Sequence, residues 1–391
     1  MMWETAKLGD YIDIQSGYAF KSNDFTDRGI PVIKIKNITP PSVSLDDLSF
    51  VPNEVAELTQ KFLLNYNDVL IALTGSHINQ MASVVGRVAR VKYNQPSMLN
   101  QRVARITVKD STECDIDYVY YYLSQDEIKI KLASNAGGAA NQANISPSDV
   151  KNLIIPFPKY KRQKAISSIL SAYDDLIENN QKQIKLLKEA ARRLYKEWFV
   201  DLRFPGHETT PIVDGVPKGW ETKKLKDIII KAPRTKQIKT SDYLTNGNIP
   251  IVDQSRGFIC GYTNDIEAKI VCNKPIIVFG DHTRVLKYIT FDFAKGADGT
   301  QLILSNNKNV PQSYLYCALV NIDLSNYHYA RHFKYLKTED IIIPNKRIAD
   351  KFDSIVSPIF TQIQTLRDKS NNAKQARDRL LPRLMNGEIE V

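Results

Sequence analysis

The chain has 391 residues, enough for two or more domains that each bury a core of their own. Apolar residues make up 43% of it, which argues against a disordered chain, and no apolar run approaches the ~20 residues that span a bilayer. The net charge of +10 favours a polyanionic partner, and because residues 1–10 lack an apolar leader we expect a cytoplasmic protein.

The opening segment of the chain returns just past its midpoint. Residues 3–10 read WETAKLGD, and residues 220–227 read WETKKLKD. Further landmarks recur in the same order, namely residues 29–32 against 248–251, 68–75 against 273–280, and 153–156 against 341–344. A repeat of this length indicates a duplicated domain. Because the stretches between the landmarks differ, we expect one architecture that carries two different binding faces.

The first copy is predicted to be mixed α/β and to end in a long helix. Residues 102–108 alternate as a strand does, residues 117–123 form a short helical segment, and a helical pattern covers residues 163–199. The apolar stripe of this helix consists of Ile166, Ile169, Leu170, Tyr173, Leu176, Ile177, Ile184, Leu187, Ala191, Leu194 and Trp198. A Pro-, Gly- and Thr-rich linker follows over residues 205–219.

The second copy repeats this order. Residues 276–279 form a short apolar strand, and residues 313–319 form a helical segment. The second long stripe consists of Phe352, Ile355, Val356, Ile359, Ile363, Leu366, Ala373, Ala376, Leu380 and Leu384. Pro358 within it predicts either a first-turn position or a kink.

Two long helices with one apolar stripe each are best buried against one another. The sequence therefore predicts an antiparallel intramolecular coiled coil. The alternative is that each helix packs only on its own domain.

The sequence lacks the usual signatures of catalysis. It contains no phosphate-binding loop, no G-x-S-x-G or H-E-x-x-H motif and no Asn/Asp-Pro-Pro-aromatic motif of the amino-methyltransferases. Its widely spaced cysteines and histidines form no metal-ligand pattern. One constellation, Asp253 with Glu267 and Lys269, has the residue types of a metal-dependent nuclease, so a stand-alone nuclease stays open as an alternative. A homodimeric DNA-binding regulator is another.

The repeat, the two helices and several motifs together resemble the specificity (S) subunit of type I restriction-modification systems, over essentially the full length. The motifs are the starts at Trp3 and Trp220, the Ile-Pro-Val/Ile strands, NQRVARI at 100–106, FGDHTR at 279–284, GADGT at 296–300, WFVDLRFP at 198–205 and LLPRLMNGEI at 380–389. The chain departs at the start of the second helix, where Arg347 stands near the place that Gln163 holds in the first.

The resemblance implies a non-catalytic, sequence-specific reader of double-stranded DNA. Two target recognition domains would each read half of a bipartite site, and the conserved helices would set the spacer and dock two modification subunits. S-adenosylmethionine would belong to those adenine-N6 methyltransferase subunits, and ATP and Mg to restriction subunits; this chain would hold no cofactor or metal. The implied fold is α/β (α+β), with two recognition domains each followed by a long helix, and an antiparallel coiled coil with pseudo-twofold symmetry.

The implied parts divide the chain into five segments. They are recognition domain 1 (1–158), the central helix (159–204), a linker (205–219), recognition domain 2 (220–344) and the distal helix (345–391).

Base edges are read chiefly by Arg, Asn and Gln, and phosphates by Lys and Arg, so loop residues of these types are the candidate DNA contacts. In the first copy they are Thr74, Ser76, His77, Asn79, Gln80, Arg87, Arg90 and Lys92, with the glycine-rich residues 135–144 as a second contact. In the second copy they are Gln254, Arg256, His282, Thr283, Arg284, Lys287, Tyr327, His328, Arg331, His332 and Lys334. Any one of them could merely solvate a loop, and Gly280 and Asp281 could form a structural turn that Asp281 caps.

Overall fold

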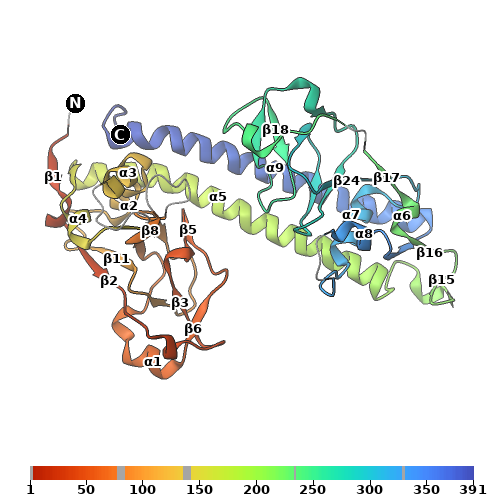
Figure 1. Cartoon of the computed structure of the whole chain (residues 1–391), viewed down its shortest axis with the longest axis horizontal. Coiled ribbons are helices and arrows are strands. Elements are labelled where there is room, and N and C mark those ends of the chain that lie inside the picture. The colour runs from red at the N-terminus through yellow and green to blue at the C-terminus, as the bar shows by residue number, and fades with distance from the viewer. Residues whose placement is uncertain (1–2, 77–83, 135–141, 233–234, 328–330) are drawn as a thin grey trace. The chain divides into compact units, whose positions relative to one another are not determined.

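A computed structural model describes residues 3–76, 84–134, 142–232, 235–327 and 331–391 (Figure 1). The chain divides into two compact units: unit 1 consists of Met1–Glu178 and Asn371–Val391, and unit 2 of Asn179–Ser370. Two long helices, α5 (Tyr160–Tyr195) and α9 (Lys346–Met385), contribute residues to both units. Within the described ranges, no helix combines the length and the apolar character needed to cross a membrane.

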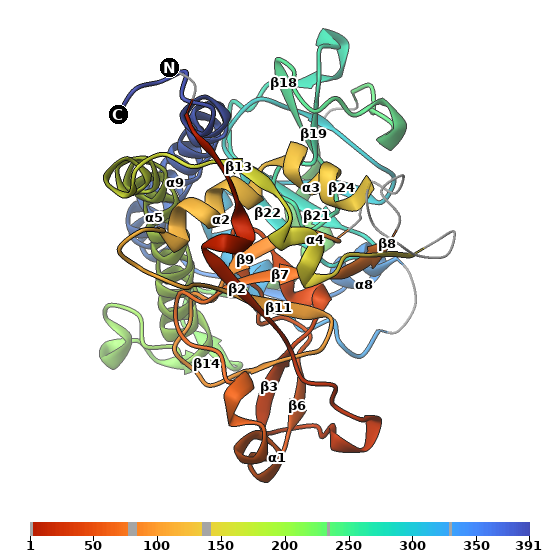
Figure 2. The ribbon, with the colours of Figure 1, turned by 90° about the vertical axis from the view of Figure 1, so that its left-hand side faces the viewer.

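Unit 1 is built on a six-stranded sheet and a three-stranded one (Figure 2). The larger sheet has the order β2 (Ile12–Ser16), β11 (Val103–Val108), β7 (Val69–Ala72), β9 (Val88–Arg90), β5 (Ser42–Val43) and β4 (Ile38–Thr39). The smaller has the order β10 (Met98–Leu99), β3 (Ile30–Ile33) and β6 (Ser49–Val51). All four residues of β7 are buried because alternate side chains enter different cores: Val69 and Ile71 one, Leu70 and Ala72 the other.

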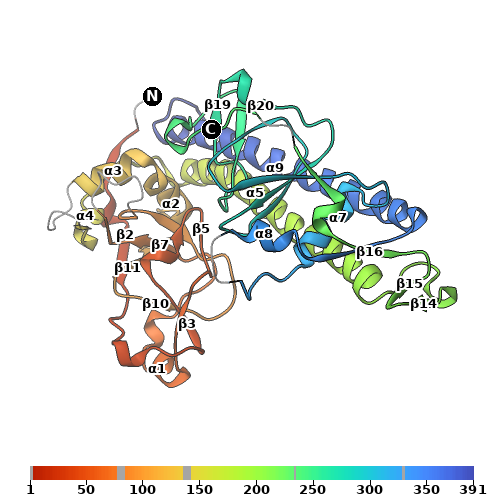
Figure 3. The ribbon, with the colours of Figure 1, turned by 45° about the vertical axis from the view of Figure 1, so that its right-hand side comes forward.

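Unit 2, drawn in green to blue in Figure 3, has two sheets of four strands each. The strand order of its first sheet matches that of four neighbouring strands in the larger sheet of unit 1. One sheet has the order β17 (Ile229–Lys231), β24 (Thr300–Ser305), β21 (Ile276–Gly280) and β22 (Leu286–Ile289). The other has the order β19 (Gly261–Thr263), β18 (Ile249–Val252), β23 (Phe293–Lys295) and β20 (Lys269–Ile270). In both units the Ile-Pro strand, β3 or β18, pairs antiparallel with one neighbour and parallel with the other. The predicted duplicated α/β architecture is confirmed.

The opening and closing landmarks of each copy pair with one another. β1 (Thr5–Lys7) lies antiparallel to β13 (Ile154–Pro156), and β16 (Glu221–Lys224) lies antiparallel to β25 (Asp340–Ile343). These landmarks therefore recur in the sequence because, in each domain, the first and the last strand pair in a two-stranded sheet.

Short helices complete the two units. In unit 1 they are α1 (Asn53–Leu58), α2 (Ile116–Ser124), α3 (Asp126–Ser134) and α4 (Pro147–Lys151), and in unit 2 α6 (Leu225–Ile228), α7 (Gln312–Asn321) and α8 (His332–Leu336). The remaining strands are β8 (Thr74–Ser76), β12 (Gln142–Asn144), β14 (Ile212–Val213) and β15 (Val216–Pro217). The predicted helical segments 117–123 and 313–319 lie in α2 and α7. A tyrosine of each helix forms a hydrogen bond to the last strand of its domain. Tyr118 Oη of α2 donates to Pro156 O in β13 at 2.8 Å, and Tyr314 Oη of α7 donates to Ile342 O in β25 at 2.5 Å.

The long helices pair antiparallel within each unit. In unit 1, Ile166 and Leu170 near the start of α5 share a core with Leu384 and Met385 at the end of α9. A buried ion pair joins the same two halves, since Asp174 Oδ1 lies 2.5 Å from Arg377 Nη1. These contacts are those of the predicted coiled coil.

In unit 2 the order is reversed, as an antiparallel pair requires. The aromatic end of α5 and of the π-helical turn that continues it (Lys196–Val200) packs on the first half of α9. The ring centroid of Phe352 lies 5.8 Å from that of Trp198 and 5.0 Å from that of Phe199. Leu176 and Ile355, assigned to the stripes from sequence, are 43% and 40% exposed, so the buried seam is narrower than predicted.

The two long helices begin differently. Gln163 is fully buried, with Oε1 accepting from Asp115 N at 2.9 Å and Nε2 donating to Pro158 O at 2.8 Å. At the start of α9 the cap is Asn345, whose Oδ1 accepts from Ile348 N at 3.1 Å. Because α9 begins at Lys346, Pro358 lies well inside the helix and not in its first turn.

A hydroxyl–carboxylate bond attaches each domain to its following helix. Ser167 on α5 donates to Asp115 before α2 at 2.5 Å, and Ser313 on α7 donates to Asp353 on α9 at 2.5 Å. The two copies thus use the same pair of groups with the donor and the acceptor exchanged between domain and helix.

Candidate nucleic-acid interface

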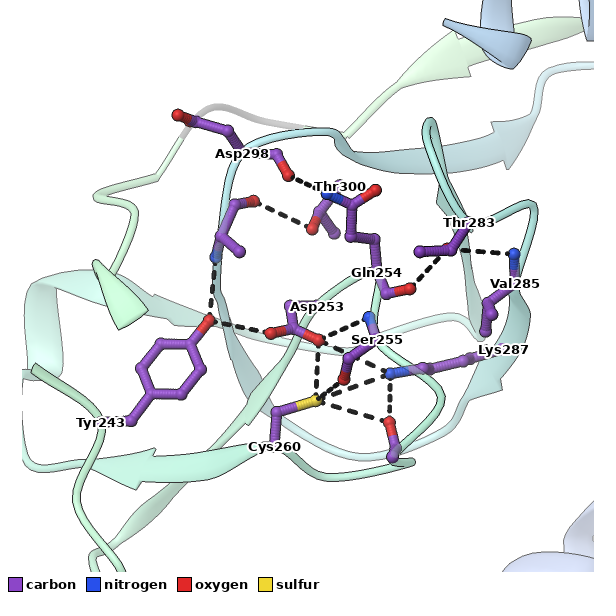
Figure 4. Close-up of polar contacts among 12 residues, drawn as sticks. Tyr243, Asp253, Gln254, Ser255, Cys260, Thr283, Val285, Lys287, Asp298 and Thr300 are labelled. Carbon is purple, nitrogen blue, oxygen red and sulfur yellow. Dashed lines mark hydrogen bonds and ion pairs between the residues drawn. The ribbon is translucent and has the colours of Figure 1, made fainter. Parts of the chain in front are cut away.

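Three loops of unit 2 meet around Gln254 (Figure 4). Its Nε2 donates to Asp298 O at 2.6 Å, and its Oε1 accepts from His282 N at 3.1 Å. Its backbone carbonyl accepts from Thr283 Oγ1 at 2.5 Å. The predicted DNA contact Gln254 therefore has both ends of its amide engaged in joining loops, and it positions His282 and Thr283.

Close backbone approach at this junction requires glycine. A Cβ on Gly280 would lie 2.1 Å from Thr283 Oγ1 and 3.0 Å from Gln254 Cβ. Gly299 has φ +79°, and a Cβ there would lie 2.7 Å from His282 Cδ2. The glycines of the two sequence motifs thus allow the loops to touch.

A second set of contacts joins the β21–β22 turn to Tyr327 and to the first residue of α8. Arg284, with φ 59°, donates from Nε to His332 Nε2 at 3.2 Å and from Nη2 to Tyr327 O at 3.0 Å. The ring of Tyr327 stacks on that of Tyr335, with centroids 4.1 Å apart. Desolvation lowers the pKa of His332, and the Arg284 guanidinium adds to this effect, so the ring is held neutral beside the arginine.

Asp281 supports the same junction in a way that the sequence did not predict. Its side chain does not cap its own turn; Oδ1 accepts from Phe333 N at 2.8 Å, at the start of α8. The carboxylate is buried, and Asp281 O also accepts from His332 N at 2.9 Å. No local pattern signals this bond, because it joins residues far apart in sequence.

Five of the predicted residues are exposed around this junction and remain candidate contacts: Arg256, His282, Thr283, Arg331 and Lys334. They come from three segments that the bonds above hold together. These charged and polar side chains are thus presented by two loops and by the start of α8, which hydrogen bonds hold together, as readout of base edges and phosphates requires.

Lys287 differs from its predicted role. Its side chain is 3% exposed, and Nζ donates to the carbonyl of Gly257, with Cys260 Sγ at 3.7 Å and Asp253 Oδ1 at 4.0 Å. Burial lowers the pKa of this amine. Because Gly257 lies within the loop that carries Arg256, the lysine holds that loop from inside and is not placed to touch DNA.

The nuclease constellation does not assemble. Asp253 accepts hydrogen bonds from Ser255 N at 2.8 Å and Tyr243 Oη at 3.1 Å, which occupy its carboxylate (Figure 4). Lys269 pairs instead with Asp292 at 2.8 Å, and the Glu267 side chain is 83% exposed. Across the part of the chain that the structure describes, no cluster of His, Cys, Asp and Glu could hold a metal ion.

In unit 1 the described parts of the two predicted contact segments meet at a short ribbon, and residues 135–141 of the second segment lie outside the described residues. β8 pairs antiparallel with β12, with Ser76 opposite Gln142, and Thr74 Oγ1 donates to Asn144 Oδ1 at 2.8 Å. The predicted contacts His77, Asn79 and Gln80, like His328 of the second copy, lie outside the described residues.

The basic residues predicted in unit 1 lie in different surroundings. Arg90 is buried, with Nη2 2.9 Å from Asp117 Oδ1 and its guanidinium 3.9 Å from the centre of the Tyr120 ring. It joins the sheet to α2 and is not placed to touch DNA, in contrast to the prediction. Arg87 is half-buried and has contacts of its own, and Lys92 lies with Nζ 5.5 Å from the Tyr66 ring centre.

Comparison with known proteins gives one consistent result. The model of a family described as "Type I restriction modification DNA specificity domain" matches residues 2–189 and 217–374. The type I restriction enzyme MjaIX specificity subunit of Methanocaldococcus jannaschii is 27% identical over 419 residues, covering 100% of this chain and 94% of the relative. The putative MjaX specificity subunit of the same organism is 27% identical over 284 residues, covering 71% of this chain and 64% of the relative.

A solved structure shares the fold. The crystal structure of the type I restriction-modification S subunit from M. genitalium superposes with a TM-score of 0.60 at 18% identity, covering 98% of this chain and 96% of that one. The similarity extends over both copies of the repeat and both long helices.

Proposed function

Because the chain belongs to the type I restriction-modification DNA specificity family, we propose that it reads a bipartite site on double-stranded DNA, with one globular domain for each half. In this family the chain is a non-catalytic specificity subunit, which leaves the nuclease alternative without support from either the comparisons or the placement of Asp253, Glu267 and Lys269.

One observation carries the proposal. The two copies share a strand order, β2-β11-β7-β9 in unit 1 and β17-β24-β21-β22 in unit 2, yet differ in what joins the last two strands. In unit 1 the connection contains β8, which pairs with β12; in unit 2 it is a tight turn tied to Tyr327 and His332. A common scaffold with unlike loops at the same place suits two domains that read different bases.

The long helices supply the second part of the proposal. α5 and α9 each belong to both units and pair antiparallel in each, so we propose that they set the spacer between the half-sites. Two modification subunits would dock on the chain and bring S-adenosylmethionine for adenine-N6 methylation. Restriction subunits, where present, would bring ATP and Mg. This chain itself would bind no cofactor.

Methylome sequencing tests the proposal. A methylation-deficient host receives this chain with its neighbouring methyltransferase, and control hosts receive each gene alone. Adenine methylation at a single bipartite motif, present only when both genes are expressed, is the expected result. Methylation by the partner alone at the same motif, or DNA cleavage by the purified chain, would count against it; a homodimeric regulator would bind DNA with no such partner.

A further inference from the structure

A polar pocket of about 310 Å³ in unit 2 lies beside the loops described above. None of the residues that line it was predicted to contact DNA. Its walls come from the end of β17, the end of β23 and the start of β24. The polar side chains that line it are those of Lys231, Thr235, Gln237, Lys295, Thr300 and Gln301.

The pocket carries positive charge without an ion-pair partner. Among the described residues no carboxylate forms an ion pair with Lys231, which is exposed, or with Lys295. Lys295 is half-buried, and desolvation lowers the pKa of its amine. The charge of Asp298 acts in the opposite direction and raises the pKa of this amine. Asp298 Oδ1 accepts from Gln237 Nε2 at 3.1 Å. A partly desolvated ammonium group gains most from an anion that supplies the missing charge.

Neutral donors accompany the two lysines. Thr235 Oγ1 is buried and has no hydrogen-bond partner among the described residues. Gln301 adds an amide group to the lining, whereas Gln237 Nε2 already donates to Asp298 Oδ1 at 3.1 Å and Thr300 Oγ1 to Ala297 O at 3.0 Å. Ammonium, hydroxyl and amide donors without a lining carboxylate form the environment that phosphate oxygens prefer.

The pocket shares a wall with the candidate interface. Residues 296–299 connect Lys295 to β24, and Asp298 O in this turn accepts from Gln254 Nε2 at 2.6 Å (Figure 4). Gly299 in the same turn lies against His282. An anion held by Lys295 would therefore be adjacent to the loops that present His282 and Thr283.

We propose that this pocket binds one backbone phosphate of the DNA half-site read by the second domain. The inference rests on the proposed function and adds to it a contact that fixes the register of the domain on the duplex without reading sequence. Its ligand class is a phosphodiester, and free inorganic phosphate is the other source of the same chemistry.

The test is the salt dependence of DNA binding by the full chain assembled with its methyltransferase partner. Each neutralised phosphate contributes about 0.9 to the slope of log K against log salt. The double variant Lys231→Met/Lys295→Met should lower the magnitude of the slope by about 0.9, and should weaken binding to target and non-target duplexes by the same factor. Lys308→Met, at an exposed lysine beyond the opposite end of β24, is the matched control.

The outcomes separate this inference from the function on which it rests. A double variant whose slope equals that of the Lys308→Met control, in an assembly that binds its target, overturns the phosphate site alone. Saturable binding of inorganic phosphate at constant ionic strength, with the DNA slope unchanged in the double variant, assigns the pocket to a free anion and also overturns it. A wild-type assembly with no preference for any duplex contradicts the proposed function instead.

Discussion

Replacing Asp174 with alanine should weaken unit 1 where the two long helices pair. The Asp174 side chain is 10% exposed and that of Arg377 is 15% exposed, and their closest atoms are 2.5 Å apart. Asp174 Oδ2 also accepts from Tyr121 Oη at 2.7 Å. The substitution thus removes the partner of a buried cation and the acceptor of a buried hydroxyl at once.

The expected loss follows from what remains around Arg377. Breaking a buried pair by removing one partner costs ~3–5 kcal/mol. Arg377 keeps Asp378, 2.7 Å away, although that carboxylate is 49% exposed. We therefore expect the lower end of the range, about 3 kcal/mol, in the free energy of opening this region.

Hydrogen exchange read by mass spectrometry suits this measurement, because the two units need not unfold together. Amides of α5 and α9 that belong to unit 1 should exchange about a hundredfold faster in Asp174→Ala. The matched control is Asp350→Ala, which breaks the exposed i,i+4 pair with Lys346 and should change exchange by less than about threefold.

An Asp174→Ala variant that exchanges no faster than the control would show that this ion pair does not stabilise the paired helices. A second substitution sharpens the test, since removing the buried cation as well should recover much of the loss. If Asp174→Ala/Arg377→Met is instead as unstable as the sum of the two single variants, the two groups do not interact as described.

Further predictions concern unit 2. Arg284→Ala should weaken binding to duplexes only at the half-site read by the second domain, because the bonds to His332 and Tyr327 are lost; equal loss for sites altered in either half would contradict this. Ser313→Ala should lower the free energy of unfolding in urea by ~1–3 kcal/mol, since it leaves the half-buried carboxylate of Asp353 on α9 without its 2.5 Å donor. Burial lowers the pKa of His332, so the folded state favours the neutral ring. The stability that this gives the folded state is lost as pH falls below about 6.5, the usual pKa of the free side chain. DNA binding at the second half-site should therefore weaken at pH 5.5 in the wild type but not in His332→Gln.

The frame of the fold could be predicted because its signals are local or periodic. Ile166 and Leu170 repeat at helical spacing, and both are fully buried where α5 meets α9. The opening and closing landmarks recur in both copies because they form the same two-stranded sheet in each domain. Leu176 shows the limit of such reasoning, since periodicity alone does not give the width of the buried stripe.

The site was predicted less well because burial of a basic side chain depends on partners distant in sequence. Lys287 was predicted to contact phosphate because it is a lysine in a loop segment, yet contacts with Asp253 and the Gly257 carbonyl hold its side chain inside the domain. Arg90 is enclosed by Asp117 and the aromatic face of α2, which follow it by more than twenty residues. The sequence did not predict the pocket at Lys295, because no residue near that lysine in sequence shows that it lacks an ion-pair partner.

The discontinuity of unit 1 has a consequence for biosynthesis. Its first segment ends at Glu178, and the part of α9 that completes its core, with Leu384 and Met385, lies in Asn371–Val391. At ~5–20 residues per second, the ribosome needs on the order of ten seconds or more to make the intervening unit 2. During that interval the nascent first domain exposes the apolar surface that α9 later covers, whereas unit 2 is one uninterrupted stretch. The domain that emerges first is therefore the one completed last, and a nonsense mutation near residue 371 would damage the N-terminal domain.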